Sequence, residues 1–78
     1  MNFVIEIFDK ETELLVFEEE LPSGHDSEIK VIMGWTDDQQ GGEGYDVTSE
    51  QLKALEKLLG KNISDPAFVF QLTCNQSL

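Results

Sequence analysis

The chain has 78 residues, of which 16 are Asp or Glu and five are Lys or Arg, so its formal net charge at pH 7 is −11. A chain of this length forms one domain with a modest core and leaves little apolar material to wall a deep substrate cavity as well. The negative charge argues against direct binding to nucleic acid or to an anionic membrane, because both require a basic surface.

The first 21 residues have the pattern of two β-strands joined by a turn. Residues 3–8 are almost all β-branched or aromatic, and residues 13–21 resume an alternating strand pattern. Residues 9–12 between them are polar and of turn length. We therefore expect an antiparallel hairpin. Its second strand becomes acidic at residues 18–20, which indicates that this end faces solvent or a partner.

A short helix is predicted over residues 26–33. Its apolar residues recur at helical spacing, Gly34 provides a stop, and Ser23 and Asp26 are both plausible N-caps. The segment 36–44 that follows has no apolar residue and three glycines, which is typical of a flexible acidic loop.

The main helix is predicted over residues 48–59. Thr48 with Gln51 three residues later fits a capping box, and four leucines form an apolar stripe that ends at Gly60. Residues 67–74 then predict a final strand.

These elements predict an α+β fold in a single acidic domain spanning residues 1–78. A hairpin without βαβ periodicity favours a three- to four-stranded antiparallel sheet, the fourth strand being a short one at residues 44–47. The main helix would cover one face and leave the other partly open. We expect Cys74 on the face opposite Phe68, Phe70 and Leu72.

The sequence offers little for catalysis, and we expect that the protein is not an enzyme. Its one histidine, His25, lies in a turn. Its one cysteine, Cys74, has no second histidine to pair with, so it fits a packed thiol better than a nucleophile. One Cys and one His do not make a four-ligand zinc site. We expect no metal, no cofactor and no catalytic residues, and we expect a cytoplasmic protein because no signal peptide or membrane span is visible.

The charge itself is then the candidate functional feature. An acidic surface accelerates association with a basic partner and suppresses wrong partners. Aromatic side chains surrounded by charge are also common at interface hot spots. The alternative is that the two aromatics close the core and the acids are merely solvated. The predicted partner-binding residues are Glu18, Glu19, Glu20, Trp35, Asp37, Asp38, Glu43, Tyr45 and Asp46.

Four short stretches, in order along the chain, resemble the cloacin-type immunity proteins, which inhibit ribonuclease bacteriocins. They are the turn at residues 8–13, the His-Asp-Ser sequence at 25–27, the Gly-Tyr-Asp-Val sequence at 44–47, and Asn-Ile-Ser-Asp at 62–65 with the aromatic strand at 68–70. The family's aromatic residues near the helix and at the C-terminus are not matched, so its toxin-contact residues do not transfer to this chain.

The resemblance implies an immunity protein that binds and neutralises a basic nuclease toxin domain, from a bacteriocin or a contact-dependent inhibition system. The composition agrees with this implication, because nuclease domains are basic in order to bind phosphates and an acidic protein can occupy the same surface. The alternative is a small acidic domain that binds some other basic protein. The oligomeric state stays open.

Overall fold

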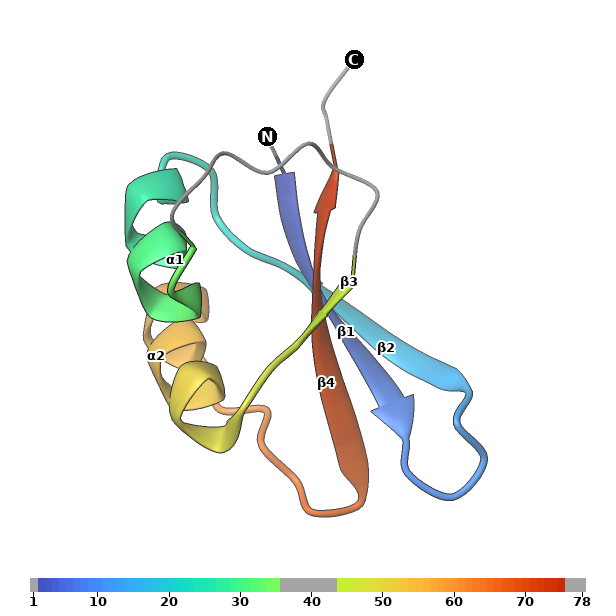
Figure 1. Cartoon of the computed structure of the whole chain (residues 1–78). Helices are drawn as coiled ribbons and strands as arrows, with labels where there is room; N and C mark the ends of the chain where they lie inside the picture. Colours follow the sequence, from blue (N-terminus) through green and yellow to red (C-terminus); the bar gives the residue numbers. More distant parts are fainter. Residues whose placement is uncertain (1, 36–43, 76–78) are drawn as a thin grey trace.

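The computed structural model describes residues 2–35 and 44–75, which form a four-stranded antiparallel sheet with two helices (Figure 1). The α+β prediction is confirmed, and the short fourth strand is present. In chain order the elements are β1 (Asn2–Asp9), β2 (Leu15–Glu20), α1 (Asp26–Met33), β3 (Gly44–Asp46), α2 (Ser49–Leu59) and β4 (Phe68–Asn75).

The sheet order is β2-β1-β4-β3, so the first and last strands lie side by side at its centre. Strand β2 covers residues 15–20 of the predicted strand 13–21, so the connection between β1 and β2 is longer than the predicted turn at 9–12. Its turn closes when the Asp9 N–H donates to the Leu14 carbonyl, and Glu13 has a positive φ of 63°. The register shifts between the next two pairs, because Phe17 lies opposite Ile7 and Leu15 lies opposite Phe8. Val16 is therefore an extra residue in β2 with no partner in β1, as in a β-bulge.

The helices begin and end largely where local signals predict. In α2 the Gln51 N–H donates to Thr48 Oγ1 and the Thr48 N–H donates to Gln51 Oε1, which completes the predicted capping box. Helix α1 has the predicted bounds, but the expectation of a Ser23 or Asp26 cap is wrong. Its N-cap is His25, whose side chain makes no capping bond, while Asp26 already lies in the first turn and favours the positive end of the helix dipole.

The core lies between one face of the sheet and the two helices. Ile5, Ile29, Leu55, Leu72 and Cys74 are fully buried there. The expected position of Cys74 is therefore wrong. Steps of two residues from Phe68 to Cys74 keep these side chains on one face of β4, so Cys74 shares the core face with Leu72.

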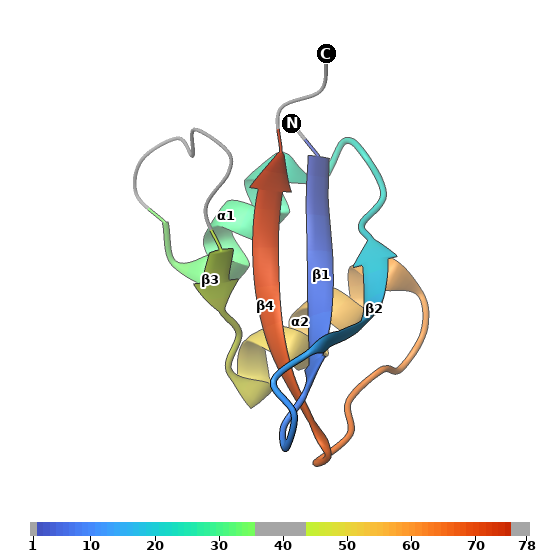
Figure 2. The same cartoon turned by 90° about the vertical axis from the view of Figure 1, so that its right-hand side faces the viewer.

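Both helices lie on the same side of the sheet. Figure 2 views the molecule from the other side, with the strands in front and α1 and α2 behind them. None of the described elements covers the front face. Antiparallel sheets often keep one face solvated, and here that face holds the side chains that alternate with the core residues.

Candidate functional site: the open face of the sheet

We call the uncovered side of the sheet the open face. Its residues follow from strand alternation and register, since residues directly opposite one another in a ladder share a face. They include Val4, Glu6 and Phe8 of β1, Leu15, Glu18 and Glu20 of β2, Asp46 of β3, and Val69, Gln71 and Thr73 of β4.

A row of polar side chains crosses the open face through all four strands. Glu18 is opposite Glu6, Glu6 is opposite Gln71, and Gln71 is opposite Asp46. Neighbouring strands lie about 4.8 Å apart, so three carboxylates fall within about 15 Å along this row. Glu20 lies beside it, opposite Val4. We call Glu6, Glu18, Glu20 and Asp46 the acidic row.

The acidic row has hydrogen-bond donors near it but no cationic residue from the strands. The Thr73 hydroxyl donates to the Glu6 carboxylate, and Gln71 Nε2 lies 3.4 Å from Asp46 Oδ1, at the outer limit of a hydrogen bond. All five lysines lie outside the four strands, in the helices or the connecting segments. Like charges directly opposite each other destabilise a sheet. The pair formed by Glu6 and Glu18 is thus held at a cost to stability.

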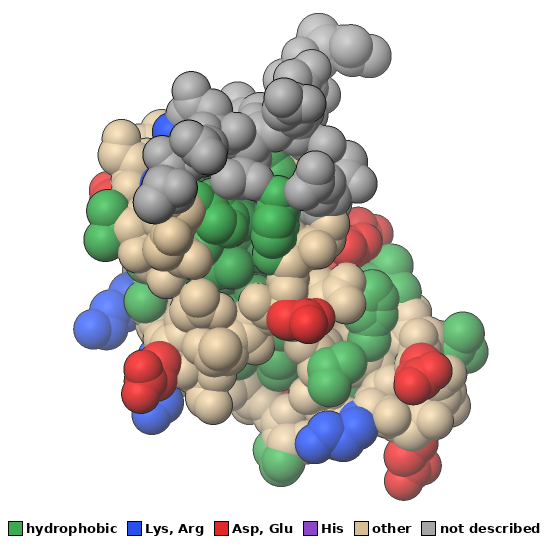
Figure 3. Space-filling model, in the orientation of Figure 1, with side chains coloured by type: hydrophobic (Ala, Val, Ile, Leu, Met, Phe, Trp, Pro, Cys, Tyr) green, Lys and Arg blue, Asp and Glu red, His purple; other side chains and the backbone are tan. Residues whose placement is uncertain are grey.

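Apolar side chains adjoin the acidic row at the hairpin end of the sheet. Phe8 lies opposite both Leu15 and Val69, and these two partners are 44% and 41% exposed. At the lower right of Figure 3, hydrophobic side chains of this end of the molecule reach the surface. The open face therefore places exposed apolar area next to concentrated negative charge, a combination that suits a protein interface.

Strand alternation divides the acidic run of β2 between the two faces. Glu18 and Glu20 are exposed on the open face, together with Asp46 from the far edge. Glu19 lies opposite Ile5 and so belongs to the helix side, where Lys61 Nζ is 2.9 Å from its carboxylate. The structure thus brings together three of the predicted acids and separates Glu19 from them.

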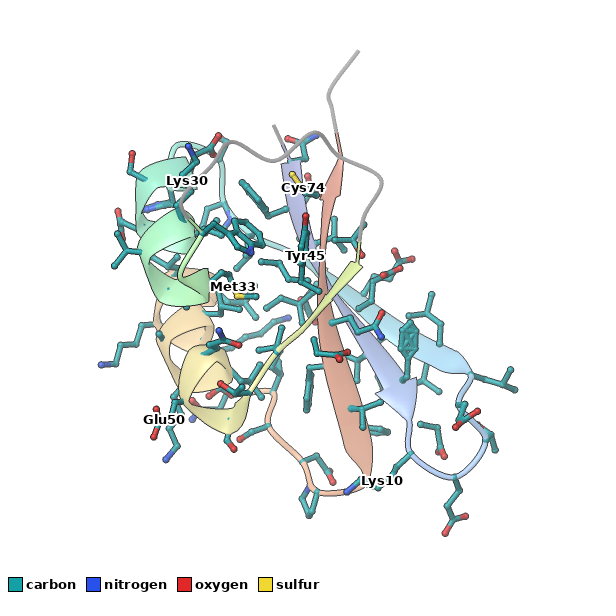
Figure 4. All side chains as sticks on the ribbon, in the orientation of Figure 1. Lys10, Lys30, Met33, Tyr45, Glu50 and Cys74 are labelled. Carbon is teal, nitrogen blue, oxygen red and sulfur yellow. The ribbon has the colours of Figure 1, made fainter. Side chains whose placement is uncertain are left out.

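The two predicted aromatic residues lie on the helix side. Tyr45 is opposite Leu72, and Figure 4 shows Tyr45 and Cys74 between the sheet and the helices. The ring of Trp35 is 4.7 Å from that of Tyr45 and 6.1 Å from that of Phe3, measured between centroids. Both aromatics are half-buried and close one end of the core, and neither adjoins the acidic row.

Three further predicted residues, Asp37, Asp38 and Glu43, lie outside the described residues.

Glu6 is the functional candidate that the sequence reasoning missed. It lies at the centre of the row, half-buried, with a glutamate opposite it on β2. A signal was present, because Glu6 is the one charged residue between Asn2 and Phe8, in a strand that is otherwise apolar. A carboxylate on the solvent side of a central strand is a stronger indication of a functional role than a carboxylate in a loop. The apolar neighbours in the strand make it a less favourable place for a charge than a loop.

Other acidic residues have structural roles away from the open face. Buried Glu56 accepts hydrogen bonds from the backbone N–H groups of Ile63 and Ser64, which ties the segment after α2 to that helix. In the hairpin turn, backbone N–H groups of Thr12 and Glu11 bind the Asp9 carboxylate and hold the pKa of Asp9 below its usual value. Net charge alone thus overstates how many acids lie on the open face.

The groups with catalytic potential do not gather at the open face. His25 Nδ1 lies 2.9 Å from Glu28 Oε1 at the start of α1, and the Cys74 thiol is buried in the core. Within residues 2–35 and 44–75, no three His, Cys, Asp or Glu side chains are grouped to hold a metal ion. No helix of that same part is both long and apolar enough to cross a membrane.

Comparison with known proteins identifies a family. None of the curated proteins and none of the solved structures matches the chain. A family model matches residues 2–73, from the start of β1 into the final strand. The chain therefore belongs to the family described as a domain of unknown function, DUF7683.

Proposed function

We propose that this protein is an immunity protein that binds and neutralises a basic nuclease toxin domain, and that the open face is its contact surface. The observation that carries the proposal is the acidic row. It sets Glu6 directly opposite Glu18, and it continues through Gln71 to Asp46.

Solubility does not account for this arrangement. Acidic residues improve solubility wherever they are exposed, and helices and turns accept them without placing them opposite one another. From the side shown in Figure 3, acidic and basic side chains are scattered singly over the surface. Concentration of carboxylates on a sheet face works against folding, and a partner that supplies lysine or arginine side chains offsets that cost.

A nuclease domain has the surface that such a face would recognise. It carries basic side chains to bind the phosphates of its substrate, and a row of carboxylates can occupy those side chains and block access to RNA. The apolar end of the open face would contribute area that excludes water around the charged contacts. This mode of inhibition needs no chemistry from the chain, which agrees with the burial of Cys74 and with the position of His25 at the start of α1.

The resemblance to cloacin-type immunity proteins supplies the class of partner. The cytoplasm is the proposed place of action, because the single cysteine fits a reducing compartment. A small acidic domain that binds a different basic protein is the second candidate, and it rests on the same charge. The two differ in the effect on RNA cleavage, which only an immunity protein would suppress.

The test mixes the purified chain with a basic ribonuclease domain encoded beside its gene. We expect a complex at nanomolar concentrations in low salt and loss of RNA cleavage at equimolar chain. A complex that leaves cleavage intact would favour the second candidate, and no complex with any such domain would contradict the immunity function.

Matched variants locate the contact surface. One variant carries Glu18→Gln, Glu20→Gln and Asp46→Asn, all exposed on the open face. The control carries Glu11→Gln, Glu28→Gln and Glu50→Gln, which are exposed in the turn and the helices. Both remove the same charge, so only contact through the open face predicts weaker binding and weaker inhibition by the first variant.

A further inference from the structure

Strand β2 forms an edge of the sheet, and part of its backbone faces outward. The Leu21 N–H donates to the Phe3 carbonyl, which shows which residues of β2 point their backbone toward β1. Because antiparallel pairs alternate between bonded and non-bonded, Glu19 bonds to β1 while the N–H and C=O groups of Glu18 and Glu20 point away. Within the described residues, β1 is the only strand that pairs with β2.

The same edge carries exposed apolar side chains, which proteins normally avoid on an edge strand because they favour pairing with another strand. Leu14, Leu15, Val16 and Phe17 are between 43% and 66% exposed. Phe17 touches the ring of Phe68 edge-on on the helix side, beyond the buried core. An exposed apolar edge strand is a template for another strand, and natural proteins usually cover it or place lysine or proline within it. Here the strand holds three glutamates instead.

We propose that an extended segment of the basic partner pairs with the outer edge of β2 as a fifth strand. The inference rests on the proposed function for the sign of the partner's charge. It adds a mode of binding, in which backbone hydrogen bonds at Glu18 and Glu20 hold the segment and side chains select it.

The two faces of β2 define the chemistry of that segment. Side chains of the added strand that neighbour Glu18 and Glu20 lie on the open face, so lysine or arginine fits there. Side chains on its other face neighbour Phe17, so an apolar residue fits there. The segment that matches this edge therefore alternates basic and apolar residues.

A second copy of this chain does not meet these requirements. In the symmetric antiparallel register that uses the outward groups of Glu18 and Glu20, each glutamate of residues 18–20 faces a glutamate of the other copy. Each copy also has a formal net charge of −11. The acids thus disfavour self-pairing at an edge that remains suited to a basic strand.

The first test uses the full chain with a synthetic peptide of about eight residues that alternates lysine and valine. A peptide of the same composition with all lysines before all valines is the control. We expect the alternating peptide to slow amide hydrogen exchange at Glu18 and Glu20, with little change at Glu19, whose N–H already bonds to β1. Equal effects of both peptides, or binding without protection at Glu18 and Glu20, would overturn the inference.

A second test separates backbone from charge. Glu20→Pro removes both the carboxylate and the outward N–H, whereas Glu20→Gln removes only the charge. We expect Glu20→Pro to bind the alternating peptide about tenfold more weakly than Glu20→Gln, because one hydrogen bond is lost and its acceptor is left unpaired. Equal affinities of the two folded variants would contradict strand pairing. If Glu20→Pro fails to fold, the exchange measurement on the unmodified chain still decides the question.

The outcomes distinguish this inference from the proposed function. Inhibition of a ribonuclease without protection of Glu18 and Glu20 would leave the immunity function standing and remove the strand-pairing mode. Pairing with the alternating peptide and no complex with any basic ribonuclease would leave the strand-pairing mode standing and remove the immunity function.

Discussion

Replacing Glu18 by lysine should stabilise the folded chain while it weakens partner binding. Glu18 is exposed and lies directly opposite half-buried Glu6. Two unit charges about 6 Å apart repel by about 0.7 kcal/mol in a water-like dielectric. Opposed pairs in sheets contribute about 0.2–1 kcal/mol. Loss of the repulsion and gain of an attraction to Glu6 should together raise the free energy of unfolding by about 1 kcal/mol.

Urea unfolding followed by circular dichroism measures this change. For a small domain whose unfolding free energy falls by about 1 kcal/mol per molar urea, the midpoint should rise by about 1 M. Glu11→Lys is the matched control, since Glu11 is exposed in the hairpin turn and the substitution changes the net charge equally. It relieves general self-repulsion but not the opposed pair, so its midpoint should move less.

Salt provides a second check on the same reasoning. In about 1 M salt the screening length falls to about 3 Å, and the difference between Glu18→Lys and Glu11→Lys should largely disappear. Equal midpoints for the two variants at low salt would refute the claim that the acidic row is held at a cost to stability.

Three further predictions concern the described fold. Thr48→Ala should lower the free energy of unfolding by about 1 kcal/mol by removing half of the capping box, whereas Thr48→Ser should retain most of it, as urea midpoints would show. The lowered pKa of Asp9 means that its ionised form stabilises the fold above the usual value of 3.8, and that this contribution is lost as the pH falls through the lower folded value. Asp9→Asn should therefore have a lower urea midpoint than the natural chain at neutral pH, and the gap should narrow at pH values below 3.8, while a gap independent of pH would contradict that sign. Cys74 is fully buried, so a thiol reagent should label it only as fast as the chain opens, and rapid labelling of the folded protein would place the thiol outside the core.

The secondary structure was largely predictable because its signals are local. The capping box at Thr48, the left-handed glycines Gly34 and Gly60, and the alternation in β1 each act within a few residues. The helix bounds 26–33 were predicted as observed. The N-cap of α1 was not predicted correctly. Ser23, His25 and Asp26 lie close together in the sequence, so the helix could begin at any of them, and the backbone path of the preceding turn decides which one is the cap.

The candidate site was predictable only in part because it depends on strand order. Nothing local indicates that Glu6 lies opposite Glu18 or that Asp46 joins their row through Gln71. Those neighbours follow from the arrangement β2-β1-β4-β3, which joins the two ends of the chain at the centre of the sheet. For the same reason adjacency in sequence was misleading. Tyr45 and Asp46 point to opposite faces, as do Glu18 and Glu19.

The association rate of a basic ribonuclease domain with the two charge-matched variants tests the central claim most directly. The rate should fall at least about tenfold further for the variant lacking the carboxylates of Glu18, Glu20 and Asp46 than for the control lacking those of Glu11, Glu28 and Glu50, and the difference should shrink with added salt. Equal rates for both variants would show that net charge alone attracts the partner and that the open face is not its contact surface.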